Sequence, residues 1–373
     1  MSWQVKRLEE IASFNLGKML DDKKNKGDPL PYLANINVRW GEFELNDLRL
    51  MRFETSELER FSLKYGDIVM CEGGEPGRCA IWKEQLPKMM YQKALHRIRP
   101  HEGIDNQFLY YAFLHKGKRG GFSPLFTGST IKHLPKEKLA KVEVEIPELL
   151  EQQRIATLLS KYDDLIENNK RRIELLEESA RQLYKEWFVR FRFPGHEHVK
   201  IIDGVPDGWS RKPLKELLTL NYGKALKAED RISGNFPVYG SSGVIGTHIK
   251  PLVKGPGIIV GRKGNVGSIF WSHLDFFPID TVYFVSADES NYFVYCALLH
   301  TAFISTDVAV PGLNRDFAYS REIIVPTDTL VSEFEEEVTP VFKQCDVLSR
   351  YNDQLMQARN LLLPKLMSGE IAV

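Results

Sequence analysis

Two patterns of apolar and polar residues alternate along this chain, and each pattern occurs twice. The first consists of short apolar runs broken by glycine, proline and asparagine, as in "DIVMCEGGEPGRCAIW" and "GIIVGRKGNVGSIFW". Such runs are typical of short strands joined by tight turns. One helix is expected within each of these regions, near 105–116 and 290–301. The second pattern is a heptad repeat, which begins after Pro147 and recurs over 333–368 and predicts a long helix after each mostly β region.

The heptads place apolar side chains on one face of each predicted long helix. In the first helix one seam row carries Ile155, Tyr162, Asn169, Leu176 and Leu183, and the other carries Leu158 and Leu159, Leu165 and Ile166, Ile173, Ala180 and Trp187. In the second helix the rows carry Val338, Cys345, Asn352, Arg359 and Leu366, and Val341, Leu348, Leu355 and Leu362. Arg359 is a defect in this pattern. The two faces together predict that the helices pair as a coiled coil.

Two asparagines, Asn169 and Asn352, align with each other and fall in these seams. An asparagine in an apolar seam weakens a coiled coil but fixes its register, and the alternative is an asparagine that faces solvent. Pro340 is tolerated in a first helical turn, so the second helix is expected to begin near residue 339. At 1.5 Å per residue, helices of about 35 residues span about 50 Å and would hold the two β regions a fixed distance apart.

The two halves of the chain are copies of each other. "LEEIASFNLGKML" and "LKELLTLNYGKAL" match at an offset of 206 residues, which aligns Gly17 with Gly223. The offset falls to 190 at the glycine-rich turns and to 185 where "NQFLYYAFLH" matches "NYFVYCALLH", so the first copy carries an insertion at roughly 38–66. We therefore predict an α+β fold built as a tandem repeat. Its predicted parts are a first β domain at 1–147, a central spacer helix at 148–190, a connector at 191–208, a second β domain at 209–326 and a C-terminal spacer helix at 327–373.

Composition narrows the class of protein without identifying it. Hydrophobic residues make up 43% and charged residues 27% of the 373 residues, as in ordinary globular proteins. No apolar run approaches the about 20 residues of a membrane helix, and the first ten residues do not resemble a secretory signal. Four scattered cysteines, Cys71, Cys79, Cys296 and Cys345, have neither paired nor metal-ligand spacing. A cytoplasmic location is therefore expected.

The net charge of zero conceals an uneven distribution. The two predicted helical segments, 148–190 and 327–373, carry 17 acidic and 12 basic residues, which leaves 33 acidic and 38 basic residues for the rest of the chain. This weak basic excess permits an anion-binding face on the β domains without requiring one.

Motifs for catalysis are missing from the sequence. It lacks a Gly-x4-Gly-Lys-Ser/Thr phosphate loop, a Gly-x-Ser-x-Gly elbow and the Asn-Pro-Pro-aromatic motif of DNA amino-methylating enzymes. "GRKGNVG" and "GSSGVIG" lie between strand-like runs, where turn glycines explain them better than a nucleotide site does. His196 and His198 flank Glu197 in the connector, but a metal site would need a third ligand. We expect no catalytic residue, no metal and no cofactor in this chain.

Polar loops recur at equivalent places in both β domains. Arginine and lysine suit phosphate and guanine, asparagine and glutamine suit adenine, and serine and threonine suit either. Polar residues fill any surface loop, but two sets in duplicated positions favour a DNA interface. Since the copies differ in these loops, they are expected to read different sequences, about one helical turn of DNA or a multiple apart. The candidate DNA-binding residues are Lys18, Lys24, Asn35, Asn37, Arg39, Arg78, Gln92, Lys93, Ser129, Thr130, Lys132, His133, Lys224, Tyr239, Ser241, Ser242, Arg262, Lys263, Asn265, His273, Asn314 and Arg315.

Three segments at the ends of the repeats resemble the DNA-specificity subunits of type I restriction-modification systems. They are "EQQRIATLL" after Pro147, "LYKEWFVRFRFPG" at 183–195 and "LLPKLMSGEI" at 362–371. The resemblance implies two target-recognition domains separated by two long antiparallel coiled-coil helices, with one half-site read by each domain. In the second copy "TDTLVSEFEEEV" replaces the "EQ..I" signature, so that helix start is expected to dock its partner differently.

The resemblance also implies partners and a division of labour. The helices would dock two methylation subunits, which methylate adenine in double-stranded DNA with S-adenosylmethionine, and a restriction subunit using ATP and Mg would be needed for cleavage. Residues expected to set the helix register or dock partners are Asn169, Asn352, Trp187, Phe188 and Leu366.

Two other functions fit parts of the sequence. One is a non-enzymatic coiled-coil scaffold whose β domains bind protein or glycan. The other is a free-standing nuclease or methyltransferase, which the missing motifs disfavour. DNA binding together with a methylation subunit would separate the specificity-subunit hypothesis from the scaffold, and binding of S-adenosylmethionine to the isolated chain would favour the enzyme.

Overall fold

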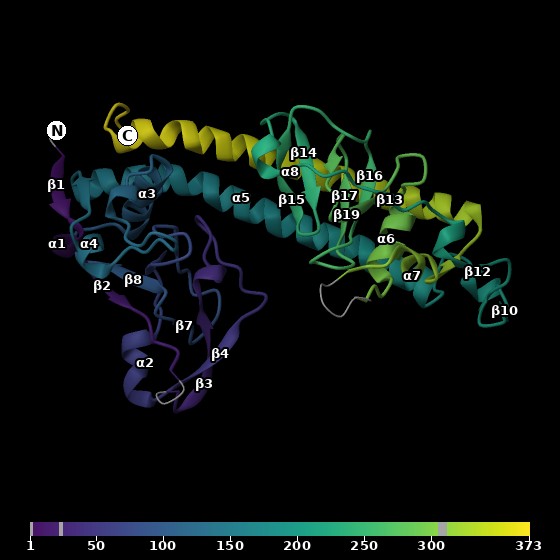
Figure 1. Ribbon diagram of the computed structural model, residues 1–373, viewed down its shortest axis with the longest axis horizontal. Coiled ribbons are helices and arrows are strands. Elements are labelled where there is room, and N and C mark those ends of the chain that lie inside the picture. The colour runs from purple at the N-terminus through teal and green to yellow at the C-terminus, as the bar shows by residue number, and fades with distance from the viewer. Residues whose placement is uncertain (1–2, 22–24, 305–311) are drawn as a thin grey trace. The chain divides into compact units, whose positions relative to one another are not determined.

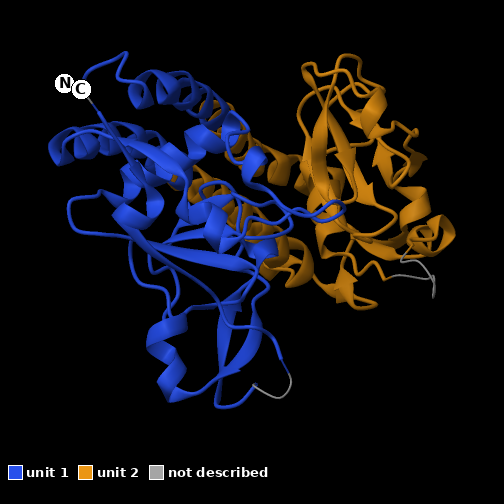
Figure 2. Ribbon diagram, turned by 60° about the vertical axis from the view of Figure 1, so that its left-hand side comes forward, with its two compact units in different colours: residues 1–167, 352–373 blue, residues 168–351 orange. Residues whose placement is uncertain are grey.

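The chain forms two compact units in the computed structural model, which describes residues 3–21, 25–304 and 312–373. Unit 1 comprises residues 1–167 and 352–373, and unit 2 comprises residues 168–351 (Figure 2). Each long helix contributes a segment to both units. These compact units do not test the domain limits expected from the sequence repeat, which stay predictions.

Among its described residues, unit 1 contains three β-sheets, of four, three and two strands. Several of these strands are labelled in Figure 1. The four-stranded sheet has the order β2-β8-β5-β6, the three-stranded sheet β4-β3-β7 and the two-stranded sheet β1-β9. All neighbours are antiparallel except β3 and β7. The strands are β1 (Gln4–Arg7), β2 (Ala12–Leu16), β3 (Asp28–Leu33), β4 (Arg49–Phe53), β5 (Ile68–Cys71), β6 (Cys79–Ile81), β7 (Met90–Tyr91), β8 (Leu95–Pro100) and β9 (Glu143–Ile146).

Unit 2 repeats this topology strand for strand. Its sheets have the orders β13-β19-β16-β17, β15-β14-β18 and β12-β20, and again one pair, β14 with β18, is parallel. A separate hairpin, β10-β11, lies in the connector. The strands are β10 (Ile201–Ile202), β11 (Val205–Pro206), β12 (Ser210–Pro213), β13 (Asn221–Tyr222), β14 (Phe236–Gly240), β15 (Gly243–His248), β16 (Gly257–Gly261), β17 (Ile269–Ser272), β18 (Phe277–Pro278), β19 (Val282–Val285) and β20 (Glu322–Val325). The identical orders confirm the duplication that the sequence predicts.

The expected insertion in the first copy corresponds to a longer connection in the three-stranded sheet. In unit 2, β14 and β15 are joined by a tight turn between Gly240 and Gly243. In unit 1 the region around β4 instead contains a long loop with a 3-10 helix and the helix α2, Thr55–Phe61. Both copies otherwise keep the helix predicted in each β region. These are α3 (Asn106–Lys118), which Asp105 caps by accepting from the Phe108 amide, and α6 (Tyr292–His300), which Asn291 caps in the same way.

Shorter elements complete the two units. The α-helices are α1 (Leu8–Ile11), α4 (Lys136–Ala140) and α7 (Arg315–Tyr319), and the 3-10 helices are η1 (Asn35–Asn37), η2 (Ser123–Leu125), η4 (His196–His198), η5 (Leu214–Glu216) and η6 (Ala228–Asp230). In the described residues, no helix has the length and apolar character needed to cross a membrane.

The predicted seam positions of both long helices are buried or half-buried, except Leu165, which is 49% exposed. Helix α5 covers Leu149–Tyr184 and continues as one π-helical turn, η3, Lys185–Val189, while α8 covers Asp328–Met367. In unit 1, Ile155 and Leu159 of α5 share a core with Leu363 and Leu366 of α8. Because the early turns of α5 meet the late turns of α8, the helices are antiparallel.

In unit 2 the opposite ends of the same helices pack together. Tyr184 and Trp187 share a core with Phe334 and Val338 of α8. Tyr184 lies 6.1 Å from Phe334 between ring centroids in an edge-to-face arrangement, a favourable aromatic geometry. Within each unit the paired helices are therefore part of the hydrophobic core.

The expected start of the second long helix near residue 339 is wrong, because α8 begins at Asp328 and runs through Pro340. A proline inside a helix costs about 3 kcal/mol through a lost hydrogen bond and a backbone clash. The turns around Pro340 bury Phe334, Val338 and Phe342 in the core of unit 2. Burying each of these side chains contributes about 1.5–3 kcal/mol, which offsets that cost.

Candidate nucleic-acid interface

A glycine–lysine pair ends the first strand of the four-stranded sheet in unit 1. The amide of Gly17 donates to the Leu95 carbonyl at 3.1 Å, and the amide of Lys18 donates to the Tyr91 carbonyl at 3.1 Å. A Cβ atom on Gly17 would lie 2.3 Å from the Tyr91 oxygen. The close approach of two backbone segments thus explains why glycine precedes lysine here.

The same crossing occurs in unit 2. Gly223 donates to the Val282 carbonyl at 3.2 Å, and Lys224 donates to the Pro278 carbonyl at 3.0 Å. A Cβ atom on Gly223 would lie 2.0 Å from the oxygen of Ile279. The matched Gly-Lys motif therefore fixes, in each unit, the start of the loop that follows β2 or β13.

A second backbone contact, present in both units, joins the turn after β5 or β16 to the loop before the short helix α4 or α7. In unit 1 the Leu134 amide donates to the Glu72 carbonyl at 2.7 Å, and in unit 2 the Leu313 amide donates to the Arg262 carbonyl at 2.8 Å. Isolated bridges pair Gly73 with His133 and Lys263 with Gly312. Loops from distant parts of the sequence are thus brought together in the same way in each unit.

Unit 1 presents several of the candidate residues at its surface. Exposed are Lys93, Ser129, Thr130 and Lys132, whereas Gln92 and His133 are half-buried. His133 Nδ1 lies 3.1 Å from a carboxylate oxygen of Glu72. These groups provide ammonium, hydroxyl, amide and imidazole chemistry on one set of loops.

Lys18 and Asn37 are internal instead. Lys18 is only 4% exposed, and its ammonium lies 2.5 Å from Glu57 and donates to the Arg52 carbonyl at 2.8 Å. Burial raises the pKa of Glu57, but Lys18 and the Glu54 amide outweigh it and lower this pKa overall. Asn37 accepts from the Ala34 amide at 2.9 Å inside its own loop. We correct the expectation that these two side chains are presented to DNA, because the protein itself occupies their polar atoms.

Arg78, Asn35 and Arg39 also have partners within unit 1. Arg78 is buried, donates to the Asn35 carbonyl at 3.0 Å and pairs with Glu75 at 2.7 Å. The Asn35 amide donates to the Gly73 carbonyl at 3.3 Å. Arg39 forms a two-pronged contact with Glu44 at 2.8 and 2.9 Å. Arg78 therefore supports the loops from within, which corrects its expected exposure, while Asn35 and Arg39 stay partly accessible. Lys24 lies outside the described residues.

Unit 2 offers a more open set of candidates. Its exposed members are Lys224, Ser242, Lys263, Asn265, His273 and Asn314, and Ser241 is half-buried. The Asn314 side chain caps α7 by accepting from the amides of Asp316 and Phe317 at 2.8 and 3.1 Å. Tyr239 is buried against Phe276, so its expected role in direct contact is corrected to packing.

His273 accepts a hydrogen bond from the Trp271 indole at 3.2 Å. Partial burial of the ring lowers the pKa of His273; Asp346 raises this pKa and Arg350 lowers it, and the overall shift is downward. With Nδ1 accepting from the indole, the neutral ring carries its proton on Nε2, which can donate a hydrogen bond to an acceptor.

Arg262 and Arg315 flank an exposed aromatic ring that sequence reasoning did not select. Their guanidinium carbons lie 5.1 and 4.9 Å from the ring centroid of Tyr222. Tyr222 stands between the aligned Asn221 and Gly223. The sequence contained a signal for this residue. Tyr222 aligns with Leu16 of the first copy, and a tyrosine in place of a leucine inside an otherwise matched motif indicates a position where the two copies differ in function.

Seam asparagines Asn169 and Asn352 are buried, with 6% and 7% exposure, which favours the seam interpretation over a solvent-facing one. Trp187, Phe188 and Leu366 are buried in the cores of their own units. These three side chains are thus unavailable to a partner, which corrects the expectation that they form a docking surface.

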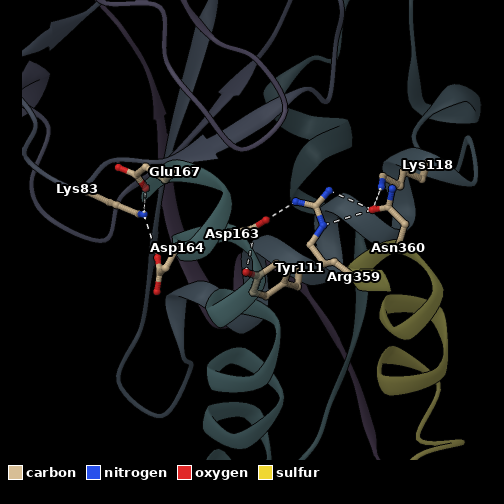
Figure 3. Close-up of polar contacts among 8 residues, drawn as sticks. All are labelled: Lys83, Tyr111, Lys118, Asp163, Asp164, Glu167, Arg359 and Asn360. Carbon is tan, nitrogen blue, oxygen red and sulfur yellow. Dashed lines mark hydrogen bonds and ion pairs between the residues drawn. The ribbon is translucent and has the colours of Figure 1, made fainter. Parts of the chain in front are cut away.

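Arg359, the predicted seam defect, forms a polar network in unit 1 (Figure 3). Its guanidinium pairs with Asp163 of α5 and donates to the Asn360 side chain at 3.0 Å. Asp163 also accepts from the Tyr111 hydroxyl at 2.7 Å, and Lys118 donates to Asn360. The network therefore joins α5, α8 and α3, and an arginine in the seam is paired rather than left unsatisfied.

A second contact fixes the β part of unit 1 to α5. The Lys83 ammonium lies 3.5 Å from Asp164 and 2.7 Å from Glu167, both on α5 (Figure 3). Lys83 follows β6, so this contact and the Arg359 network orient the loops of unit 1 relative to its helices.

In the described part of the chain, no group of three or more histidine, cysteine or acidic side chains could hold a metal ion. Cys71, Cys79, Cys296 and Cys345 are free and buried. Burial raises the pKa of Cys296 to about 12, so this thiol stays protonated and is a poor nucleophile.

Comparison with known proteins gives consistent matches. A family model described as type I restriction modification DNA specificity domain matches residues 1–178. The type I restriction enzyme MjaIX specificity subunit of Methanocaldococcus jannaschii is 25% identical over 417 aligned residues, which cover 100% of this chain and 94% of that protein. The HindI specificity subunit of Haemophilus influenzae is 22% identical over 355 residues, covering 72% of this chain and 76% of that protein.

One solved structure shares the fold over nearly the full length. The crystal structure of the type I restriction-modification system S subunit from M. genitalium superposes with a TM-score of 0.53 at 20% sequence identity. The match covers 98% of this chain and 96% of that chain. The two proteins therefore share a fold.

Proposed function

We propose that the chain is a type I restriction-modification DNA specificity subunit, as the family model over residues 1–178 and the similarity to the MjaIX specificity subunit along the whole chain support, and that each of its units reads one half of a bipartite, asymmetric DNA sequence. The chain is a DNA-recognition component rather than an enzyme. The observation that carries the proposal is the repeated loop framework, in which Gly17 and Gly223 make the same backbone crossing while the surrounding side chains differ. A common frame with different side chains presents two different surfaces to one duplex.

Charge on these loops suits the DNA backbone. Exposed lysines lie on or beside the loops that these backbone contacts fix, namely Lys93 and Lys132 in unit 1 and Lys224 and Lys263 in unit 2. Neutralising phosphates with lysine releases counterions, so binding should weaken steeply as salt is raised. The net charge of the chain is zero, so we propose that it binds weakly alone and tightly once assembled with its partners.

We propose that two methylation subunits dock on the long helices, each bringing its own S-adenosylmethionine. Since Trp187, Phe188 and Leu366 are buried, the docking surface would use apolar side chains that the helices expose. These include Leu175 on α5, 62% exposed, and Leu361 on α8, 71% exposed. Exposed apolar side chains mark protein–protein contacts where they gather into a large patch. A restriction subunit with ATP and Mg would add cleavage, and the buried free thiols fit a cytoplasmic assembly.

Mapping methylated adenines tests the proposal directly. Genomes of cells that carry this gene together with its methylation subunit would be compared with genomes of cells that lack only this gene. The proposal predicts one bipartite sequence, methylated in the first cells and unmethylated in the second. Methylation at the same sequence in both genomes would contradict it.

A binding assay separates the proposal from an assembly scaffold. A gel shift with duplex DNA would be run on the chain with and without the methylation subunit, at two salt concentrations. We expect a shift that depends on the subunit and weakens at high salt. Absence of any shift in both mixtures would favour the scaffold.

A further inference from the structure

Three side chains on the surface of unit 2 form a compact cationic and aromatic cluster. Tyr222 of β13 is 51% exposed, and the guanidinium groups of Arg262 and Arg315 lie near its ring at 5.1 and 4.9 Å. Within the described part of the chain, neither guanidinium forms an ion pair with a carboxylate. Both positive charges are therefore uncompensated and half-exposed.

The structure holds Arg262 in place before any ligand arrives. One guanidinium nitrogen, Nη1, donates to the Asp280 carbonyl at 2.9 Å, and the guanidinium carbon also lies 5.7 Å from the Tyr283 ring. The Arg262 carbonyl accepts from the Leu313 amide at 2.8 Å. The remaining face of the guanidinium is thus presented at a fixed position, which lowers the entropy lost on binding.

Arg315 is held by the neighbouring element. It is the first residue of α7, and its guanidinium carbon lies 5.9 Å from the Tyr319 ring of the same helix. The Tyr319 hydroxyl accepts from the Leu220 amide at 2.9 Å, which ties α7 to the strand that carries Tyr222. Two arginines from separate loops are thus fixed around one ring.

Unit 1 carries different chemistry at the equivalent positions. The backbone contact made by Arg262 in unit 2 is made by Glu72 in unit 1, and Glu72 faces His133 rather than an aromatic ring. The position of Arg315, two residues after the contact leucine, is occupied by Lys136, which donates to Asn15 at 3.3 Å. A carboxylate at this place repels the O6 and N7 acceptors of guanine, whereas a guanidinium matches them.

We infer that Arg262 and Arg315 read guanine in the half-site bound by unit 2, with Tyr222 as the positioning ring between them, and that unit 1 does not read guanine at the equivalent place. The inference rests on the proposed function. Arginine bound to O6 and N7 of guanine is the commonest specific contact in the major groove, and its planar fork is needed for the two-pronged geometry. Lysine keeps the charge but loses that geometry.

Arginine-to-lysine variants test the inference in the complex assembled with its methylation subunit. Arg262→Lys and Arg315→Lys would each be compared with Arg211→Lys, a control on the exposed strand β12 outside the cluster. Methylation rates would be measured on duplexes that carry each of the four base pairs in turn at every position of the unit-2 half-site. For at least one of the two cluster variants we expect the preference for one G·C pair to fall about tenfold or more, as for loss of a bidentate contact. The control and the unit-1 half-site keep their preferences.

The possible outcomes separate the inference from the function. A wild-type complex that methylates no specific sequence would remove the proposed function itself. A specific site whose unit-2 half contains no G·C pair, or whose preferences both variants leave unchanged, would overturn the inference alone. Should a variant fold poorly, judged by its melting temperature, the same wild-type complex would be tested on duplexes with 7-deazaguanine, which lacks N7. Loss of methylation at one substituted position supports the inference, and full tolerance overturns it.

Discussion

His96 and Tyr283 make the same contact in the two units with different chemical groups. Nε2 of His96 lies 2.8 Å from the Leu134 carbonyl, and the Tyr283 hydroxyl donates to the Leu313 carbonyl at 3.0 Å. The amides of the same two leucines donate to the turns that follow β5 and β16. A buried side-chain donor therefore holds the loop that contains this leucine in both copies: His96 of β8 in unit 1 and Tyr283 of β19 in unit 2. The loop is held in the same way although the donating residue differs.

Lower pH should destabilise the protein through His96. Burial lowers the pKa of His96, so the folded state takes up the proton at lower pH than the unfolded state, whose histidine titrates near 6.5. This contribution to stability is fully present above about pH 6.5 and is lost as pH falls through the folded pKa, with a slope of up to about 1.4 kcal/mol per pH unit.

Chemical denaturation of the wild type and of His96→Gln between pH 8 and pH 5 checks this expectation. Glutamine keeps an amide donor for Leu134 but does not titrate, so the variant should show a smaller fall in unfolding free energy. His198→Gln, at an exposed histidine, is the matched control and should retain the wild-type slope. Equal slopes for the wild type and His96→Gln would refute the assignment.

Alanine at the repeated glycines should destabilise both units. A Cβ atom at Gly17 or Gly223 would lie within about 2–2.5 Å of a backbone carbonyl, and a backbone, unlike a flexible side chain, cannot move aside alone. We expect a loss of about 1–3 kcal/mol in unfolding free energy for either variant, as for other overpacked sites. Gly103→Ala adds a Cβ where nothing lies within 4 Å and reports the cost of its positive φ alone. A loss no larger than that of Gly103→Ala would contradict the close approach.

The pair of Arg359 and Asp163 should show strong energetic coupling. Arg359→Leu leaves the Asp163 carboxylate in a half-buried place, where Tyr111 is its remaining side-chain donor among the described residues, so we expect a loss of about 1–3 kcal/mol. The double variant with Asp163→Asn keeps an acceptor for Tyr111 without the charge, and should recover part of that loss.

Arg350 and Asp346 offer the control for this cycle. They lie on the same helix, pair at 2.9 Å and leave Arg350 well exposed, so Arg350→Leu should change stability by about 0.5 kcal/mol or less. If the losses in unfolding free energy caused by the Arg359 and Asp163 changes simply add in the double variant, the two residues do not stabilise the packing of the helices in unit 1 through their contact.

Replacing Asn169 with leucine should affect register more than stability. Asn169 is buried at a seam position, where asparagine weakens pairing but selects one alignment of the helices. We expect Asn169→Leu to keep or raise the melting temperature while the complex accepts DNA sites with a wider range of gaps. Unfolding of the variant, or an unchanged gap requirement, would contradict this role.

The sequence predicted the elements whose evidence is local or periodic. Heptad spacing identified the buried positions Ile155, Val338 and Asn352, because helical geometry alone brings residues of one seam to one face. Matched motifs predicted the duplicated topology. The start of α8 was not predictable from the local rule for Pro340, since the compensating burial of Phe334 comes from the tertiary core.

The candidate site was predicted only in outline, because its geometry depends on partners far apart in the chain. Lys18 is internal because Glu57 lies on α2, inside the insertion of the first copy. Tyr222 was missed because its two arginines come from different loops and meet only in the folded unit. Residue type indicated which chemistry was possible, but burial decided which side chains are available.

Exchange of one unit's recognition segment tests most directly whether the two copies read DNA independently. Residues 1–147 would be replaced by the equivalent segment of a similar specificity subunit, and methylated adenines would be mapped in cells that supply the same methylation subunits. We expect one half of the methylated sequence to change and the other half to stay as in the wild type. A change in both halves, or in neither, would contradict this expectation.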